Sequence, residues 1–479
     1  MFVRITYQRV RIDSNKVAYV MENDQKYLTK NREKFNKDLL DFISIPSIAA
    51  LPEHAKDVQR AAVWLKDRMF KAGIENVEIM DTGGQPAVYG DWLHAGSDKP
   101  TALIYGHFDV QPVDPLDLWN IDPFKPIIKD NKIYGRGASD DKGSMFIPIV
   151  VFESIFKTSE TFPFNIKFIF EGEEEVASPN MPEFVSKNVN KLTCDMIFSA
   201  DGGQFSEDEC ELAVAYKGIL GFDIEVTGPD TDKHSGLYGA AIANPVMALS
   251  QLIASMKNEK GEIAVDGFYD EVIPLTSKDR EEISRVPFDE KKFVEQTGAI
   301  CLDGEIGYTP LERVSARPTI DLNGISGGYQ GAGTKTVLPS KAFAKITCRL
   351  VADQKPKEVL KKIEKHVEKH LPSGVTGKVI PLQDEGDPLL IPSDLNSMKL
   401  AKEVLKNIYG KDPYIIRVGG SIPILSAFYR FLGVYTTTFS FQLNDENWHA
   451  PNEFFRLSSF YKGQEAYRQL FHKIGCLSS

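Results

Sequence analysis

The stretch FIFEGEEEVAS (residues 168–178) joins an apolar run to a dense block of carboxylates. The apolar part is typical of a buried strand, and four glutamates follow it within five positions: Glu171, Glu173, Glu174 and Glu175. Two like charges about 4 Å apart repel by about 4 kcal/mol at the effective dielectric of a protein surface. Either the block is a solvated turn, in which water screens the repulsion, or a cation lies among the carboxylates.

Strand-like and helix-like runs alternate around this block. The periodicity predicts two helices, and the apolar runs that end in polar or acidic residues predict three strands. The helical spacing covers 53–74, with Gly73 as the end of that helix, and 144–156. The strands are 101–110, 165–172 and 195–203. The first 40 residues are polar and predicted to be helical. Strands that alternate with helices indicate an α/β domain with a mostly parallel sheet.

The pattern changes near residue 212. The order of elements becomes strand, helix, strand, strand, helix, strand, which is the ferredoxin-like α+β arrangement. Its members are 221–228, 244–256, 317–326, 341–351, 356–371 and 377–382. A charged stretch, 259–310, is predicted to be an irregular insertion. Because the helix–strand alternation resumes near residue 386, we predict a catalytic domain from 1–211 and 386–479 and an inserted lid or dimerisation domain from 212–385.

Composition excludes several classes of protein. The chain has 479 residues, of which 42% are hydrophobic, so two domains are expected. A net charge of −11 argues against a nucleic-acid binder. No run approaches the roughly 18 apolar residues of a membrane span. The five cysteines are odd in number and free of CxxC spacing, which favours reduced thiols in a cytoplasmic protein.

Acidic and histidine side chains follow the predicted strands of the first domain. In open α/β sheets, ligands bind outside the carboxyl ends of the strands. The residues at these positions are His107, Asp109, the four glutamates, Asp201 and His449, with Asp140 and Asp141 in a glycine-rich segment. Carboxylates with one imidazole per ion suit zinc, manganese or cobalt. Two ions bridged by one carboxylate, roughly 3.5–4 Å apart, are a common hydrolytic arrangement.

Each of these residues has a structural alternative when taken alone. An acid after a strand usually serves a turn, and a lone histidine usually forms a hydrogen bond. A second pair, His366 and His370 in HVEKH, resembles a zinc motif, but its glutamate is not at the second position. We expect both of these histidines to lie beside the apolar stripe of their helix, toward solvent.

Six motifs occur in order over nearly the whole chain from about residue 35. They are GHFDVQP, YGRGASDDKG, EGEEE, DKHSGLYG, GGSIP and WHAPNE. With them the chain resembles the di-metal metallopeptidases that include carboxypeptidase G, succinyl-diaminopimelate desuccinylase, aminoacylase and carnosinase. It is most similar to the branch of cytosolic non-specific dipeptidases, whose members cleave carnosine-like and Cys-Gly dipeptides.

The resemblance implies roles for the residues of the first domain. Two divalent ions per subunit are expected, zinc first and manganese or cobalt as alternatives. It implies that His107 and Asp201 hold one ion, Glu175 and His449 the other, and that Asp140 bridges them. It also implies that Glu174 is the general base, that Asp109 orients His107, and that the Asp140–Asp141 peptide is cis.

The resemblance also implies substrate contacts, of which all but Ser421 lie in the predicted inserted domain. Arg349 is similar to the residue that grips the substrate carboxylate, and Thr336 and Ser421 match substrate-contacting positions. His234 resembles a catalytic histidine that the partner subunit supplies to stabilise the oxyanion, so a homodimer is expected. From the residues alone, two structural alternatives remain open. Arg349 would then form a surface or lid salt bridge, and His234 would be an ordinary loop histidine.

The chain departs from the family pattern at a few positions. Phe108 stands where tyrosine is common, and Ala177 stands where the family usually has glycine, so a positive φ there would be strained. Asp201 is followed by an unusual GGQF.

The predicted function is metal-dependent hydrolysis of short peptides, most of all dipeptides, by metal-activated water with a glutamate base. A carboxypeptidase or an N-acyl-amino-acid deacylase of the same fold is the alternative, and a non-catalytic peptide-binding relative is a remote one. The sequence leaves open the native metal, the preferred substrate and the extent of domain closure.

Overall fold

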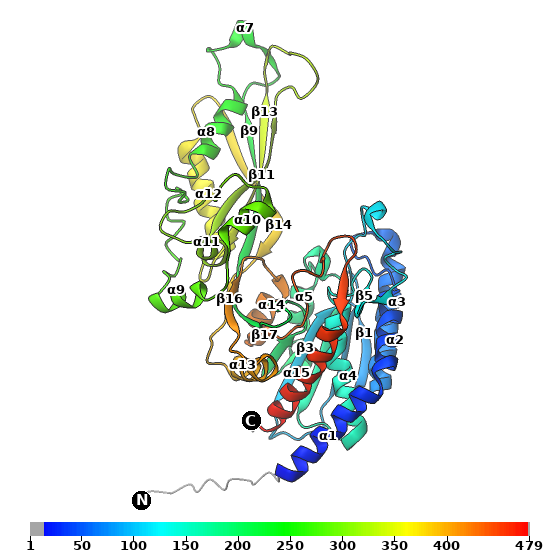
Figure 1. The fold of residues 1–479 in the computed structure, drawn as a ribbon. Helices are drawn as coiled ribbons and strands as arrows, with labels where there is room; N and C mark the ends of the chain where they lie inside the picture. The colour runs from blue at the N-terminus through cyan, green and yellow to red at the C-terminus, as the bar shows by residue number, and fades with distance from the viewer. Residues whose placement is uncertain (1–13, 478–479) are drawn as a thin grey trace, which may run out of the picture. The chain divides into compact units, whose positions relative to one another are not determined.

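The computed structural model describes residues 14–477 and divides the chain into two compact units (Figure 1). The predicted helical character of the first 40 residues is confirmed from residue 14 onward, and its earlier part lies outside the described residues. The first unit comprises Met1–Cys210, Asp394–Pro413 and Phe431–Ser479, and the second comprises Glu211–Ser393 and Tyr414–Arg430.

The unit boundaries differ from the predicted ones in the C-terminal part. The prediction assigned all of 386–479 to the first domain, whereas residues 414–430 belong to the second unit. The reason is strand pairing, because β16 (Tyr414–Val418) runs parallel to β8 (Glu211–Tyr216) and forms its hydrogen-bond ladder there. An alternation pattern shows that a strand exists but not which sheet it joins.

The first unit is built on a six-stranded sheet of order β1-β2-β6-β3-β7-β17. Its last four strands pair in parallel, and β2 is antiparallel to β6, so the mostly parallel sheet is confirmed. Strand β6 is buried along its whole length, as its apolar run predicts. The strands are β1 (Glu75–Met80), β2 (Ala87–Trp92), β3 (Thr101–His107), β6 (Asn165–Glu171), β7 (Met196–Ser199) and β17 (Thr436–Thr438). A smaller sheet contains β4 (Ile127–Lys129), β5 (Lys132–Tyr134) and β18 (Phe454–Arg456).

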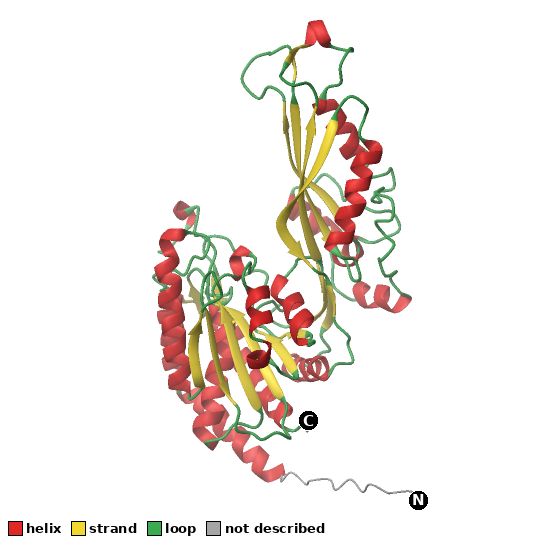
Figure 2. Cartoon of the chain, turned by 180° about the vertical axis from the view of Figure 1, so that it is seen from behind, coloured by secondary structure: helices red, strands yellow, loops and turns green. Residues whose placement is uncertain are grey.

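Helices α3, α4, α15 and α13 form a continuous layer in which α4 packs on both α3 and α15, and α13 packs on α15 (Figure 2). Helix α4 is apolar on nearly all sides and is therefore buried from Lys142 to Ile155. Helix α3 ends at Gly73, whose φ of 102° is a left-handed conformation suited to glycine. The main helices are α1 (Ser14–Lys30), α2 (Arg32–Ile43), α3 (Ala55–Ala72), α4 (Lys142–Ser159), α5 (Met181–Lys187), α6 (Val189–Leu192), α13 (Asn396–Tyr409) and α15 (Leu457–Gly475).

The second unit contains the predicted ferredoxin-like arrangement. Its sheet has the order β11-β13-β9-β14, all neighbours are antiparallel, and α8 and α12 pack on its strands. The elements are β9 (Gly218–Thr227), α8 (Pro245–Ala254), β11 (Thr319–Gly327), β13 (Lys341–Leu350), α12 (Pro356–His370) and β14 (Thr376–Gly386). Two small sheets join β15 (Leu389–Leu390) with β8 and β16, and β10 (Lys233–His234) with β12 (Val337–Leu338).

The stretch 259–310 is more regular than predicted. It contains two complete helices and the start of a third, and each is capped by the side chain of the residue just before it: Thr276, Asp289 and Thr309. These caps satisfy amides that a short, charged helix would otherwise leave unpaired. The short helices of this unit are α7 (Ser235–Tyr238), α9 (Ser277–Ser284), α10 (Glu290–Thr297), α11 (Pro310–Ala316) and α14 (Pro423–Leu432).

The expectation for the HVEKH histidines is wrong for one of the two. His366 is buried, and its Nε2 lies 2.9 Å from the hydroxyl of Ser255, the residue that follows α8, while His370 is exposed. The side chain of His366 thus belongs to the contact between α12 and α8, which helical periodicity alone does not reveal. Between residues 14 and 477, the longest apolar helices fall short of what a membrane span requires.

Candidate metal centre

The carboxyl ends of the parallel strands bring together the predicted ligands of the first unit. His107 is the last residue of β3 and lies in register with Glu171 of β6. Glu174 and Glu175 follow in a single turn of 3-10 helix, Glu174–Val176. Asp201 comes two residues after the end of β7, and His449 lies in the loop between β17 and β18. The strand-end placement inferred from the sequence therefore holds.

Asp140 lies between the two histidines. Its Oδ1 is 3.1 Å from Nε2 of His107, and its Oδ2 is 3.0 Å from Nε2 of His449. Nε2 of His449 is also 3.2 Å from Oε2 of Glu175. A carboxylate that faces one imidazole with each oxygen has the geometry required of a bridge between two ions.

Two groups of potential metal ligands overlap at Asp140. One contains His107, Asp140 and Asp201, the other Asp140, Glu175 and His449, and within each group the ligand atoms lie within 4.8 Å of one another. Each group offers one imidazole and two carboxylates, a donor set that suits zinc, manganese or cobalt. The residues therefore fit two divalent ions that share one carboxylate.

The electrostatics of the cluster answer the question posed by the glutamate block. Burial raises the pKa of Glu175 to about 7 and that of Asp201 to about 6, and the repulsion of Asp140 acts in the same direction on both. Burial also raises the pKa of Glu174 well above its usual range. These carboxyl groups cannot all ionise without a cation. Bound divalent ions would supply the missing positive charge.

The pKa shifts of Asp140 and His449 favour the charged form of each group. Burial alone would raise the pKa of Asp140, but its contacts with His107 and His449 outweigh burial and hold that pKa below its usual range. The same contact with Asp140, together with one to Glu175, raises the pKa of His449 to about 10. Without metal, protonated histidine side chains thus supply the positive charge beside these carboxylates.

Asp109 has a larger structural role than the sequence predicted. Its Oδ1 is 3.5 Å from Nδ1 of His107, which is the predicted orienting contact. In addition, its two oxygens accept hydrogen bonds from the backbone amides of Glu174 at 3.1 Å and Glu175 at 3.0 Å. One buried carboxylate therefore sets the positions of His107 and of the glutamate turn together.

Sequence reasoning missed Glu453, which holds the segment that carries Asp140. This carboxylate is 1% exposed and accepts hydrogen bonds from the amides of Gly137, Ser139 and Asp140 at 2.9, 2.9 and 3.0 Å. Arg136 donates to it at 2.8 Å. Its place at the end of WHAPNE was the available signal, but nothing in the spacing indicated which amides it would bind.

Three further side chains that the sequence did not single out contact this cluster. Gln111 donates to Oε2 of Glu175 at 2.8 Å, and Gln442 donates to Oδ1 of Asp141 at 3.1 Å. Glu446 accepts a 2.6 Å hydrogen bond from the hydroxyl of Ser139. Such outer contacts orient ligands and are invisible in a motif.

The backbone of the glutamate turn confirms the expected departure from glycine. Ala177 has a φ of 69° and Ser178 a φ of 51°, both in the left-handed region. An L-residue there costs roughly 1–2 kcal/mol. The peptide bond between Asp140 and Asp141 is cis, as the resemblance implied.

The remaining predicted residues belong to the second unit. Arg349 and Ser421 are brought together, since Nη1 of Arg349 donates to the Ser421 hydroxyl at 3.0 Å. Thr336 and His234 lie side by side at β10 and β12, where the amide of Ser235 donates to the Thr336 carbonyl at 3.1 Å. Nδ1 of the exposed His234 accepts a hydrogen bond from Gly236 at 3.0 Å, so the neutral ring carries its proton on Nε2.

A parallel sheet with two carboxylate–imidazole groups at its carboxyl edge is the arrangement of a metal-dependent hydrolase. Residues 103–473 match the model of Peptidase family M20/M25/M40, and the chain belongs to this family. The expectation of a peptidase, drawn from the motifs, is confirmed.

Proteins of known activity resemble the chain over nearly its whole length. It is 28% identical to the Cys-Gly metallodipeptidase of Saccharomyces cerevisiae, over 92% of this chain and 96% of that protein. It is 27% identical to the human Beta-Ala-His dipeptidase, over 96% and 93% of the two chains. Among solved structures, the M20 family metallo-carboxypeptidase from Sulfolobus solfataricus has a TM-score of 0.80 at 29% identity and covers 92% of this chain and 99% of that one.

Proposed function

We propose that this protein is a metal-dependent dipeptidase that hydrolyses the peptide bond of unblocked dipeptides. The observation that carries the proposal is the pair of ligand groups that share Asp140, with Glu174 beside them. The similarity to a Cys-Gly and to a Beta-Ala-His dipeptidase supports a dipeptide substrate.

His107, Asp140 and Asp201 would hold one ion, and Asp140, Glu175 and His449 the other. We propose zinc as the native metal, with manganese or cobalt as alternatives, because all three accept mixed imidazole and carboxylate ligands. When bound, the ions supply Lewis-acid charge for the scissile carbonyl and lower the pKa of water.

Glu174 is the proposed general base. Its carboxyl belongs to neither ligand group, and Asp109 fixes its backbone amide. A base with a raised pKa accepts a proton from the attacking water and still releases it to the leaving amine. Glu174 thus moves one proton from water to the new amino terminus.

Arg349 and Ser421 are proposed to bind the substrate carboxylate, and Thr336 to contact the substrate nearby. The guanidinium is held by a neutral hydroxyl, which leaves its charge available for an anion. His234, with its proton on Nε2, can donate to a developing oxyanion. In this proposal it serves the site of a partner subunit.

A homodimer through the second unit is proposed on the same basis. Leu237, beside His234, is 74% exposed, and Ile325 on the edge strand β11 is 51% exposed. Apolar side chains at a tip and along a sheet edge favour contact with a second copy. A cytoplasmic location is also proposed, because the five cysteines are thiols rather than disulfides.

The resemblance to a metallo-carboxypeptidase favours a second candidate, removal of a C-terminal residue from longer peptides or of an acyl group from an amino acid. Both alternatives use the same Arg349 contact with a carboxylate. A non-catalytic relative would not need the two groups of metal ligands that the first unit orients.

The decisive experiment measures amino-acid release from a panel of dipeptides by chelator-stripped protein with zinc, manganese or cobalt added back. We expect cleavage of unblocked dipeptides only after metal is restored, and about 10²–10⁴-fold less in Glu174→Gln. Cleavage of N-acylated substrates or longer peptides instead would establish the second candidate. Metal uptake without hydrolysis of any substrate class would contradict both.

A further inference from the structure

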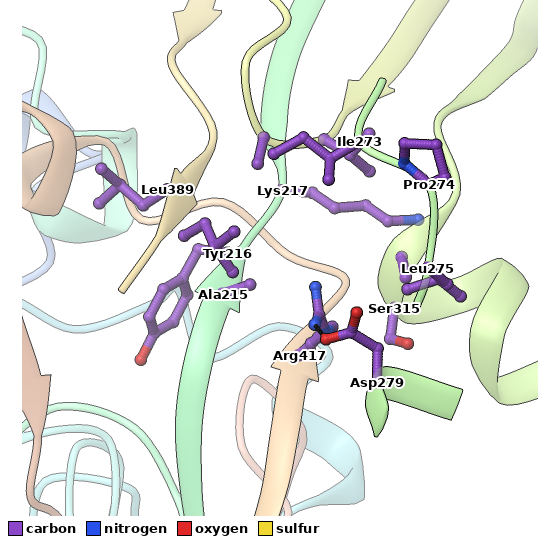
Figure 3. A pocket seen from close by; sticks show the side chains of 14 residues that line it. Ala215, Tyr216, Lys217, Ile273, Pro274, Leu275, Asp279, Ser315, Leu389 and Arg417 are labelled. Carbon is purple, nitrogen blue, oxygen red and sulfur yellow. Dashed lines mark hydrogen bonds and ion pairs between the residues drawn. The ribbon is translucent and has the colours of Figure 1, made fainter. Parts of the chain in front are cut away.

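A cavity of about 70 Å³ lies within the second unit, and all of its lining residues belong to that unit. Strand β8, the loop before α9, helix α11, strand β15 and strand β16 line it (Figure 3). Polar and apolar atoms line it about equally, and its apolar side chains include Ile273, Leu275 and Leu389. None of the motifs in the sequence pointed to this cavity.

Lys217 extends into the cavity from the junction of β8 and β9. Its side chain is 3% exposed. The ammonium donates one hydrogen bond, to the carbonyl of Arg313 at 3.1 Å, and within residues 14–477 it forms no ion pair. Two of its three N–H donors therefore remain for another partner.

The other charged groups of the cavity do not balance this ammonium. Arg417 is paired with Asp279, so the lining has two cations and one anion, an excess of one positive charge. Burial lowers the pKa of Lys217 to about 8. The carboxylate of Asp321, which is not among the lining residues, opposes this shift, whereas Arg349 and Arg317 act in the same direction as burial. A buried ammonium that no carboxylate contacts directly is costly, and an anion of single charge would stabilise it.

We propose that this cavity binds a small aliphatic carboxylate, with its carboxylate on the ammonium of Lys217 and its hydrocarbon against Ile273, Leu275 and Leu389. The volume accommodates about five water-sized groups, which is the number of non-hydrogen atoms in propionate. The single excess charge favours a monoanion over phosphate. The apolar side chains among the lining residues favour an alkyl carboxylate over a hydrated inorganic ion.

The cavity connects to the proposed substrate contacts through the backbone of Lys217. The Lys217 carbonyl accepts a 2.5 Å hydrogen bond from the hydroxyl of Ser421, which in turn accepts from Arg349. The carboxylate site is therefore adjacent to the Arg349–Ser421 pair and distinct from it. Its existence does not depend on the peptidase activity.

The test is a titration of the full-length, metal-loaded protein with ¹³C-labelled propionate, followed by NMR line broadening and saturation transfer. We expect saturable binding that Lys217→Met weakens at least tenfold, because methionine keeps the length of the side chain without its charge. Propionate on the metal centre would persist in this variant, so the difference reports the cavity alone. Lys357→Met, at an exposed lysine of α12, should bind like the wild type.

Two further probes keep the test decisive. Ser315→Leu fills the cavity from helix α11 while Lys217 stays in place, and it should also abolish this binding. Glycine should bind more weakly than propionate, because its ammonium meets two cations. Equal propionate binding by wild type, Lys217→Met and Ser315→Leu, each with wild-type circular dichroism, would overturn the proposal, as would complete competition by chloride at constant ionic strength.

Discussion

The metal centre and the Lys217 cavity contain opposite excesses of charge. In the first unit, carboxylates outnumber the two imidazoles, and burial raises the pKa of Glu175 and Asp201. Among the residues that line the Lys217 cavity, cations outnumber carboxylates, and burial lowers the pKa of Lys217. The cause is the same in both regions, because a low-dielectric interior disfavours whichever form is charged. The comparison teaches that an excess of buried charge of one sign indicates a ligand of the opposite charge.

The two regions differ in how firmly the charged groups are held. Around the metal centre, Asp109 and Glu453 together accept hydrogen bonds from five backbone amides, so the ligands are positioned before any ion binds. Lys217 reaches its cavity on a flexible side chain held by one hydrogen bond. We therefore expect the metal centre to be selective for its ions and the Lys217 cavity to bind a carboxylate with modest affinity.

The largest effect is expected from Asp140→Ala, which removes the carboxylate common to both ligand groups. Both ions should be lost, and dipeptide hydrolysis should fall by more than the roughly 10²–10⁴-fold expected for loss of a general base. Metal content by mass spectrometry, compared with Glu174→Gln, which should retain its metals, checks this. A variant that retains two ions per chain would contradict the bridging role.

Next in size is the effect of pH on Lys217. Its folded-state pKa of about 8 lies below the usual lysine value of 10.5, so the unfolded chain binds more protons between these two pH values. The free energy of unfolding should then rise by up to about 3 kcal/mol as the pH increases from 8 to 10.5. Lys217→Met should remove this rise.

Urea denaturation followed by circular dichroism between pH 7 and 10.5 measures this contribution. Lys357→Met serves as the control, because that lysine is exposed on α12. Parallel pH profiles for wild type and Lys217→Met would contradict the assignment of an unbalanced charge.

A smaller effect is expected at Glu453, through the segment that carries Asp140. Glu453→Gln keeps the shape of the side chain but replaces an acceptor of three amides and of Arg136. Metal affinity should fall about 10–100-fold, as for other residues that orient ligands. Competition with a fluorescent chelator measures it, with the exposed Glu368→Gln as a matched control. Unchanged affinity would show that the ligands hold their positions without this contact.

The smallest effect is expected at the glutamate turn. Ala177→Gly restores a residue that adopts a φ of 69° without steric cost. The gain is at most about 1 kcal/mol, since glycine also loses more conformational entropy on folding. Thermal unfolding of the metal-free protein checks it, and a fall in melting temperature would show that Ala177 is not strained.

Local sequence patterns were sufficient for the strands and helices that carry the site and for the positions of its metal ligands, but not for the helices within 259–310. Apolar runs located β3, β6 and β7, and the residues at their ends lie together because parallel strands share a carboxyl edge. The ferredoxin-like order also followed from periodicity. The roles of the individual site residues rest on the resemblance and remain predictions.

Long-range partners were beyond such patterns. No periodicity shows that β16 joins β8, that His366 packs on Ser255, or that Glu453 binds amides more than 300 residues away. The sequence by itself determined the main strands and helices outside 259–310, the parallel sheet and the set of acids and histidines at its edge, because these depend on local spacing. Only the tertiary structure decided which carboxylates position that set and where Lys217 is buried, because both depend on contacts between distant segments.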